Sequence, residues 1–372
     1  MNNVYCRQDS SLSIEEKRVF QVHLDQLGLS GNIWDLFDEW VAKSIPSIRF
    51  FYLKVYRDDD LIGLGLFLRI KPFDLRTSYA RLRKNALLNN FAWFLSALTR
   101  NCVYISFRNL ITSNLTRPFF FREPGLEDTV MKAILKSLKS EKDADMVTII
   151  DTATNDSIYE TESFEKYPCS SEASLDATVY NDISEYLRGH RSLKKNLSRK
   201  KISVVTEIKH GPLSDADKEQ MLACVECSAG HSKISNPCQK FFEENIFKTH
   251  VFDSEDYIHI LIRLDSRIIG FHTFQVSGKD MGGVLGGFNR EYSQKCFAYE
   301  RVIVASLDYA IKNEIACVHY SLIDNYTKLR LVESREPCGL YFFSGNPLNR
   351  MVFRLTYKFN DINELHLLET GN

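Results

Sequence analysis

No part of this 372-residue sequence is apolar over the length that a membrane-spanning helix requires. The first twenty residues lack an apolar run after a basic start, so we expect no signal peptide. The formal net charge is only −1, which excludes binding of nucleic acid over the whole surface and confines any anion site to a local patch. The nine cysteines are scattered and odd in number, which favours reduced thiols over a disulfide framework. Together these absences predict a cytoplasmic protein without a membrane span.

The composition is ordinary for a globular protein, with 44% hydrophobic and 26% charged residues. The chain is too long for one compact core of usual size, so we expect two domains. One order of elements occurs twice, namely a strand hairpin followed by a strand, a helix, a strand and a helix. This order predicts an α/β fold in which each domain is a mixed, mostly antiparallel sheet flanked by helices. We place an N-terminal domain at residues 1–180, a basic junction helix at 181–201 and a C-terminal domain at 202–372.

Apolar residues spaced three and four apart predict helices, and short alternating or continuous apolar runs predict strands. In the first half the expected helices are 32–45, 82–98, 126–140 and 157–164, and the expected strands are 48–56, 61–70, 118–121 and 146–151. In the second half the expected helices are 214–227, 238–248 and 299–313, and the expected strands are 202–208, 257–264, 267–276, 282–288 and 316–322. The Ser- and Glu-rich stretch 161–177 is typical of a loop.

The segment from Tyr186 to Lys201 is strongly basic, with seven Lys or Arg among its last fourteen residues. At about 100° per residue, Tyr186, Leu193 and Leu197 share one face of a helix and cations occupy the opposite face. Such a charge run is ordinarily a solvated surface. Its place between two similar halves favours a different interpretation, in which it borders the cleft between them and attracts the phosphates of a bound donor. The cations expected to do so are Arg191, Lys194, Lys195 and Arg199.

Five segments share their order and residue types with one group of enzymes. They are 121–128 in the first half, 192–201 at the junction, and 286–292, 299–310 and 325–330 in the second half. In these segments the sequence resembles the tandem GNAT-like acyltransferases, and among them the acetyltransferase family associated with polysaccharide or cellulose biosynthesis, which is related to the Fem-type aminoacyltransferases. The resemblance implies two GNAT-like repeats that move an acyl group from a thioester, acyl-CoA or an acyl carrier protein, to an amine or hydroxyl bound between them.

The turn that holds phosphate in a GNAT domain is incomplete in both halves. The family uses an Arg/Gln-x-x-Gly-x-Gly/Ala turn, whose backbone N–H groups bind the pyrophosphate of coenzyme A. The corresponding stretch of the second half, 291–300, has no glycine. The first half keeps Arg122 and Gly125, but Glu127 and Asp128 follow at the helix start and would repel phosphate. The sequence therefore does not say which half binds the donor.

Acyl transfer needs a base for the acceptor's proton, a group that holds the oxyanion and an acid for the leaving group. Glu291 and Glu300 follow the expected strand 282–288, where a GNAT-type sheet splays and admits the acyl group. His272 and His319 lie on expected strands, and we expect both to face the same groove. Each has an ordinary alternative, since a lone Glu after a strand is commonly a surface cap and a lone strand His is commonly a core residue.

Further candidates follow the expected strand 316–322. The resemblance implies that a tyrosine at Tyr326 protonates the leaving group. Lys328 and Arg330 come next and are suited to holding a phosphate or carboxylate. Asn289, in the segment after the glycine-rich strand, is a further candidate for donor or substrate binding.

Two other patterns resemble a metal site and a nucleotide site, but each has a better explanation. Cys224 and Cys227, with His231 and Cys238 further on, have the residue types of a zinc site. The first two fall at i, i+3 near the end of an amphipathic helix, where small thiols pack well, and we expect no metal. The glycine-rich run 282–287 lacks the Lys-Ser/Thr ending of a phosphate loop. It predicts a strand whose glycines let a ligand or a neighbouring backbone approach closely.

Three functions stay open on the sequence. The leading one is an acyltransferase, with an N-acyl product favoured, that acts on a small-molecule acceptor. The second is an aminoacyl-tRNA-dependent aminoacyltransferase of Fem type, in which the basic helix contacts RNA phosphates. The third is a non-catalytic binding protein on a degenerate transferase fold. The donor, the acceptor and the oligomeric state are not encoded in any pattern that we can read.

Overall fold

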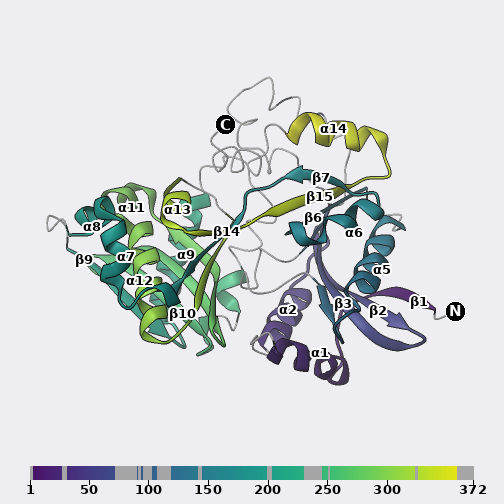
Figure 1. The fold of residues 1–372 in the computed structure, drawn as a ribbon, viewed down its shortest axis with the longest axis horizontal. Coiled ribbons are helices and arrows are strands. Elements are labelled where there is room, and N and C mark those ends of the chain that lie inside the picture. Colours follow the sequence, from purple (N-terminus) through teal and green to yellow (C-terminus); the bar gives the residue numbers. More distant parts are fainter. Residues whose placement is uncertain are drawn as a thin grey trace.

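Two mixed sheets flanked by helices make up the fold (Figure 1). The computed structural model describes residues 3–26, 32–71, 90, 94, 103–106, 119–140, 145–198, 203–229, 245–249, 252–322 and 326–357. The predicted α/β fold is thereby confirmed. The expected helix 82–98 lies almost entirely outside the described residues. Of the expected helix 238–248 only 245–248 are described, with a 3-10 helix at Ile246–Lys248. Within the described part of the chain, every helix is too short or too polar to span a bilayer.

The first sheet has the order β1–β2–β3–β4–β6–β15–β7, and β5 also pairs with β3. Its strands are β1 (Val4–Asp9), β2 (Ile48–Arg57), β3 (Asp60–Ile70), β4 (Val103–Ser106), β5 (Phe119–Phe121), β6 (Met146–Thr152), β7 (Glu165–Pro168) and β15 (Cys338–Phe343). Alternate side chains of β2 enter different cores, because successive strand residues point to opposite faces. Phe50 and Tyr52 belong to the cluster that contains α1 (Ile14–Gln26) and α2 (Asn32–Ala42). Phe51 and Leu53 pack with α5 (Glu127–Ser140).

The second sheet has the order β14–β8–β13–β12–β11–β10–β9. Its strands are β8 (Glu172–Asp176), β9 (Val204–His210), β10 (Tyr257–Leu264), β11 (Arg267–Ser277), β12 (Asp280–Phe288), β13 (Cys317–Leu322) and β14 (Ser334–Glu336). Helix α9 (Asp215–Ala229) covers one face and α12 (Ala298–Lys312) the other. One buried cluster includes Trp40 and Phe50 of the first half with Phe252 and Phe271 of the second, so the halves share apolar contacts.

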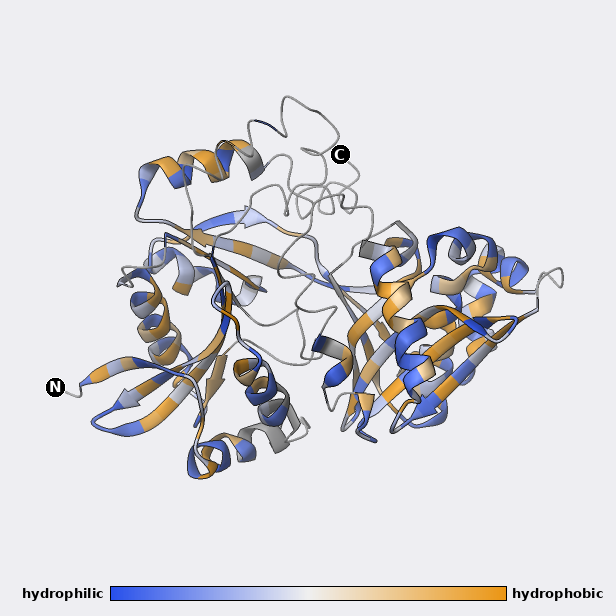
Figure 2. Cartoon of the chain, turned by 180° about the vertical axis from the view of Figure 1, so that it is seen from behind, coloured by the Kyte–Doolittle hydropathy of each residue, from blue (hydrophilic) through white to orange (hydrophobic). Residues whose placement is uncertain are grey.

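The sheets exchange strands. β8 follows β7 in the sequence but pairs with β13 and β14 of the second sheet, and β15 returns to pair with β6 and β7 of the first. The expected loop 161–177 is therefore wrong, because it contains β7 and β8. The boundaries expected at 180 and 202 do not follow the sheets either. Helix α14 (Pro347–Tyr357) also lies beside β7 and β15, with hydrophobic and hydrophilic residues alternating along it (Figure 2).

The basic segment forms two short helices rather than one. They are α7 (Ile183–Gly189) and α8 (Arg191–Leu197), and the chain turns at His190 with φ −114° and ψ 60°. Tyr186 and Leu193 are buried, as the apolar stripe predicts. The segment connects β8 to β9, both in the second sheet, and it lies at the end of the molecule away from the first sheet (Figures 1 and 2). It therefore does not join the two halves.

Candidate functional site

The parallel strands β12 and β13 pair only at their first residues. The ladder runs from Asp280 opposite Cys317 to Gly282 opposite His319 and then ends, although both strands continue. On its other edge β12 pairs with β11, and the register skips Val284. Such a bulge redirects backbone groups and is common beside active sites. The separation of two parallel strands and a bulge thus coincide on β12, where the resemblance places the entry of the acyl group.

His272 of β11 covers this part of β12. A β carbon at Gly283 would lie 2.7 Å from His272 Nε2, and one at Gly286 would lie 2.9 Å from its Nδ1. Only glycine leaves room for the ring at these distances. The imidazole also stacks on Phe274, with ring centroids 4.4 Å apart. We predicted that a ligand or a neighbouring backbone approaches these glycines, but at Gly283 and Gly286 the group that approaches is a side chain.

Another glycine of β12 faces the opposite side of the sheet. A β carbon at Gly287 would lie 2.7 Å from the backbone nitrogen of Val225 in α9. The glycines therefore serve two purposes. Gly283 and Gly286 admit His272 on one face, and Gly287 lets a helix pack closely on the other.

Lys328 lies beyond the last residue pair of β12 and β13. It belongs to α13 (Tyr326–Leu331), is 3% exposed, and its Nζ donates to the carbonyl oxygen of Tyr320 over 2.9 Å. Burial first, and the Lys328 ammonium second, lower the pKa of His272 to about 3. The imidazole is therefore neutral near pH 7 and a weak base. A neutral ring beside a cation is better suited to polarising a carbonyl than to removing a proton.

His319 points to the other face of the sheet. Val318 and Tyr320 are buried in the core with α12, so strand alternation directs Cys317 and His319 away from it. His319 Nε2 is 3.5 Å from Asp280 Oδ1. Burial alone would lower the pKa of His319, but hydrogen bonds with Asp280 and Cys317 raise it to about 10. The expectation that His272 and His319 share one groove is wrong.

The stretch after β12 is a helix, α11 (Arg290–Cys296), where a GNAT domain would have its phosphate turn. Asn289 caps it, since its side chain accepts from the N–H of Glu291 over 3.1 Å. The side chain of Glu291 is exposed, and Glu300 is half-buried in the first turn of α12. Asn289 also lines a cavity of about 160 Å³ beside α9. None of these contacts places Asn289, Glu291 or Glu300 against His272.

The candidates of the first half lie apart from those of the second. Arg122 is exposed, and Gly125 has φ +88°, a left-handed conformation that favours glycine. The turn that they form ends at α5, whose first turn contains Glu127 and Asp128. The predicted acidic helix start is confirmed. This turn lies between β5 and α5 at the first sheet, whereas His272 lies on β11 of the second sheet.

The remaining predicted residues are surface groups or lie outside the description. Arg191, Lys194 and Lys195 are exposed on α8, and Arg330 is exposed near the end of α13. Outside the described residues or side chains lie Arg199, His231, Cys238 and the side chain of Tyr326.

The two cysteines of the predicted zinc pattern make ordinary packing contacts. Cys224 is buried and its thiol donates to the carbonyl of Ile268 over 3.4 Å. The sulfur of Cys227 accepts from the backbone N–H of Arg290 over 3.4 Å. Both contacts fit the interpretation of small thiols at a helix end.

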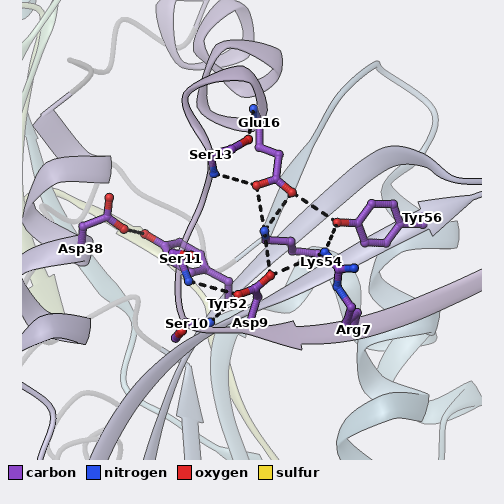
Figure 3. Close-up of polar contacts among 10 residues, drawn as sticks. All are labelled: Arg7, Asp9, Ser10, Ser11, Ser13, Glu16, Asp38, Tyr52, Lys54 and Tyr56. Atoms are coloured by element: carbon purple, nitrogen blue, oxygen red, sulfur yellow. Dashed lines mark hydrogen bonds and ion pairs between the residues drawn. The ribbon is translucent and has the colours of Figure 1, made fainter.

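A separate polar cluster lies in the first half, between β1, β2 and α1 (Figure 3). Lys54 is 3% exposed, and its Nζ lies 2.8 Å from both carboxylate oxygens of Glu16 and 3.0 Å from Asp9 Oδ2. Tyr56 donates to Glu16, and Arg7 donates to the Tyr56 hydroxyl. Each charge has a partner of opposite sign, so the cluster ties α1 to the sheet.

No protein-family model and no curated protein matches the sequence. Solved structures of similar fold cover nearly the whole chain. L-PGS from Bacillus licheniformis matches with a TM-score of 0.53 and 10% identity, over 93% of this chain and 96% of that one. A tandem GNAT protein from the clavulanic acid biosynthesis pathway gives 0.53 and 10%, over 93% and 99%. FemX gives 0.52 and 11%, over 94% and 99%. At these identities the likeness shows the fold alone, which is the α/β fold of tandem GNAT structures.

Proposed function

We propose that the protein is an acyltransferase whose acyl site lies where β12 and β13 separate. The observation that carries this proposal is that His272 and Lys328 both lie at that point, where the charge of Lys328 helps to lower the pKa of His272. His272 occupies the space left by Gly283 and Gly286, and Lys328 bonds to Tyr320 just beyond the last strand pair. A donor thioester, acyl-CoA or an acyl carrier protein, would deliver its carbonyl there, and the acceptor would be a small-molecule amine or hydroxyl.

In the proposed reaction, the acceptor's nitrogen or oxygen bonds to the carbonyl carbon, the carbon–sulfur bond breaks, and the acceptor's proton ends on the departing thiol. The Lys328 ammonium stabilises the oxyanion of the tetrahedral intermediate, and the neutral His272 ring supplies a hydrogen bond to the same carbonyl. The low pKa of His272 argues against its use as the base. Glu291 and Glu300 stay our candidates for the base, and Tyr326 for the acid.

Helix α11 favours one alternative donor. It fills the place of the phosphate turn, so a pyrophosphate would find no backbone cradle after β12. An aminoacyl-tRNA needs no such cradle, and its phosphates would be held by exposed cations. Arg191, Lys194 and Lys195 of α8 and Arg330 of α13 are of this kind. An aminoacyl-tRNA-dependent aminoacyltransferase is therefore our second candidate.

The test is a transfer assay with acyl-CoAs of several chain lengths, acyl carrier protein and aminoacyl-tRNA, each offered to a mixture of amine and hydroxyl acceptors. With the active donor, Lys328→Met is expected to lower kcat by about 100-fold or more, because it removes an oxyanion partner. His272→Gln should lower it less, and melting temperatures of both variants verify folding. Lys312→Met and His210→Gln, on the surface of the second half, are the matched controls.

Full activity in well-folded His272→Gln and Lys328→Met would contradict the site. Silence with every donor, in transfer and in calorimetric binding, would contradict the enzyme and leave the binding protein. Transfer from aminoacyl-tRNA alone, with tRNA affinity that falls steeply as salt rises, would establish the second candidate.

A further inference from the structure

Three metal-binding residue types meet at the start of the β12–β13 ladder. Cys317 and His319 are two residues apart on β13 and therefore share a face. Asp280 is the residue of β12 that pairs with Cys317. The thiol, an imidazole nitrogen and a carboxylate oxygen all lie within 4.8 Å of one another. Within the part of the chain that the structure describes, no other group of His, Cys, Asp and Glu side chains converges in this way.

We propose that Asp280, Cys317 and His319 bind a divalent transition-metal ion, for which Zn²⁺ is the best match. Thiolate, imidazole and carboxylate are the ligands that zinc takes in proteins, and three of them leave the fourth tetrahedral position to water or a ligand. Regular strands hold the three side chains, and sites built on such elements need little rearrangement. The group does not depend on the Cys224–Cys227 pattern, whose thiols are used in packing.

An ion bound by these three residues would join β12 to β13. The β12–β13 ladder has three residue pairs, and the ion would link the two strands at the first and last of them. It would sit on the opposite face of the sheet from His272, so it is separate from the proposed acyl site. The inference needs no assumption about the protein's activity.

The experiment uses the full chain, stripped with a chelator and titrated with Co²⁺ under reducing conditions. Cobalt bound to a thiolate in a tetrahedral site gives a near-ultraviolet charge-transfer band and intense visible bands, and Zn²⁺ should displace it. We expect one ion per chain. Cys317→Ser should abolish the charge-transfer band, and His319→Ala should weaken binding by at least about tenfold. Cys227→Ser is the matched control, because it removes a half-buried thiol from the same half of the protein.

Absence of cobalt bands in the wild-type protein would overturn the proposal. So would bands that persist in a folded Cys317→Ser variant, or bands that disappear in Cys227→Ser instead. Circular dichroism of each variant establishes that a lost band is not a lost fold. An added readout is the melting temperature, which Zn²⁺ should raise in the wild type and in Cys227→Ser but not in Cys317→Ser.

Discussion

Replacing Lys54 by Met should destabilise the first half of the protein strongly. Met keeps the length and apolar character of the side chain but removes the ammonium that lies 2.8 Å from Glu16 and 3.0 Å from Asp9 (Figure 3). The two carboxylates are left together with side-chain exposures of only 20% and 29%. Breaking a fully buried pair costs 3–5 kcal/mol, and some access to water reduces the penalty, so we expect a loss of about 2–3 kcal/mol at pH 7.

The loss should depend on pH in a defined direction. Burial alone would raise the pKa of both carboxyls, but Lys54 and nearby backbone N–H groups lower the pKa of Asp9 and Glu16 below their usual values. Groups with a lowered folded pKa stabilise the native state above the unfolded pKa, near 4, and lose that contribution as pH falls through the folded value. The difference between the wild type and Lys54→Met should therefore be large at pH 7 and small near pH 3.

Urea denaturation followed by circular dichroism at several pH values measures both effects. The double variant Lys54→Met with Glu16→Gln is the matched control, because it removes a carboxylate together with the cation. It should recover part of the loss at pH 7. A cost below about 1 kcal/mol at pH 7, or an equal cost at pH 7 and pH 3, would refute the electrostatic account of this cluster.

Three further predictions concern the second half. Gly287→Ala should cost about 1–3 kcal/mol in urea denaturation, because its β carbon would lie 2.7 Å from the α9 backbone. A β carbon at Gly345 would meet no atom of the described residues within 4 Å, so Gly345→Ala should be neutral. Tyr186→Phe should cost about 1–2 kcal/mol, because the buried hydroxyl donates to a backbone carbonyl over 2.8 Å; an unchanged midpoint would argue against that bond. Gly283→Ala should displace His272 and lower transfer about as much as His272→Gln does, and wild-type kinetics would contradict the role of the ring.

The sequence by itself determined elements whose cause is local. The turn Asp58–Asp59 has φ of 47° and 73°, and Asp265–Ser266 has 47° and 68°, as two-residue hairpins require. Both hairpins were predicted from pairs of neighbouring apolar runs, 48–56 with 61–70 and 257–264 with 267–276. Helix α12 spans Ala298–Lys312 against an expected 299–313, because its apolar spacing repeats over four turns. In these cases the signal lies within a few residues of the structure that it produces.

Part of the candidate site followed from the same local signals. His272 and Lys328 were predicted from residue type and position, and the glycines of β12 from composition. The alternation of Cys317 and His319 could have placed both on one face of a strand. The pairing of Asp280 with this strand could not be predicted from the sequence. A ladder of three residue pairs is set by contacts between segments far apart in the chain.

The tertiary structure alone decided which strands pair and which faces meet. No residue of β8 or β15 identifies the strand with which it will pair. β8 nevertheless pairs in the second sheet and β15 in the first, because the backbone groups of an open strand edge can pair with any strand that reaches them. We assigned the basic segment to the junction because it lies near the middle of the sequence. Since β8 pairs in the second sheet, the segment connects two strands of that sheet and does not join the halves. His272 and His319 were expected in one groove. They lie on opposite faces, because side-chain direction depends on register and bulges that only the assembled sheet fixes.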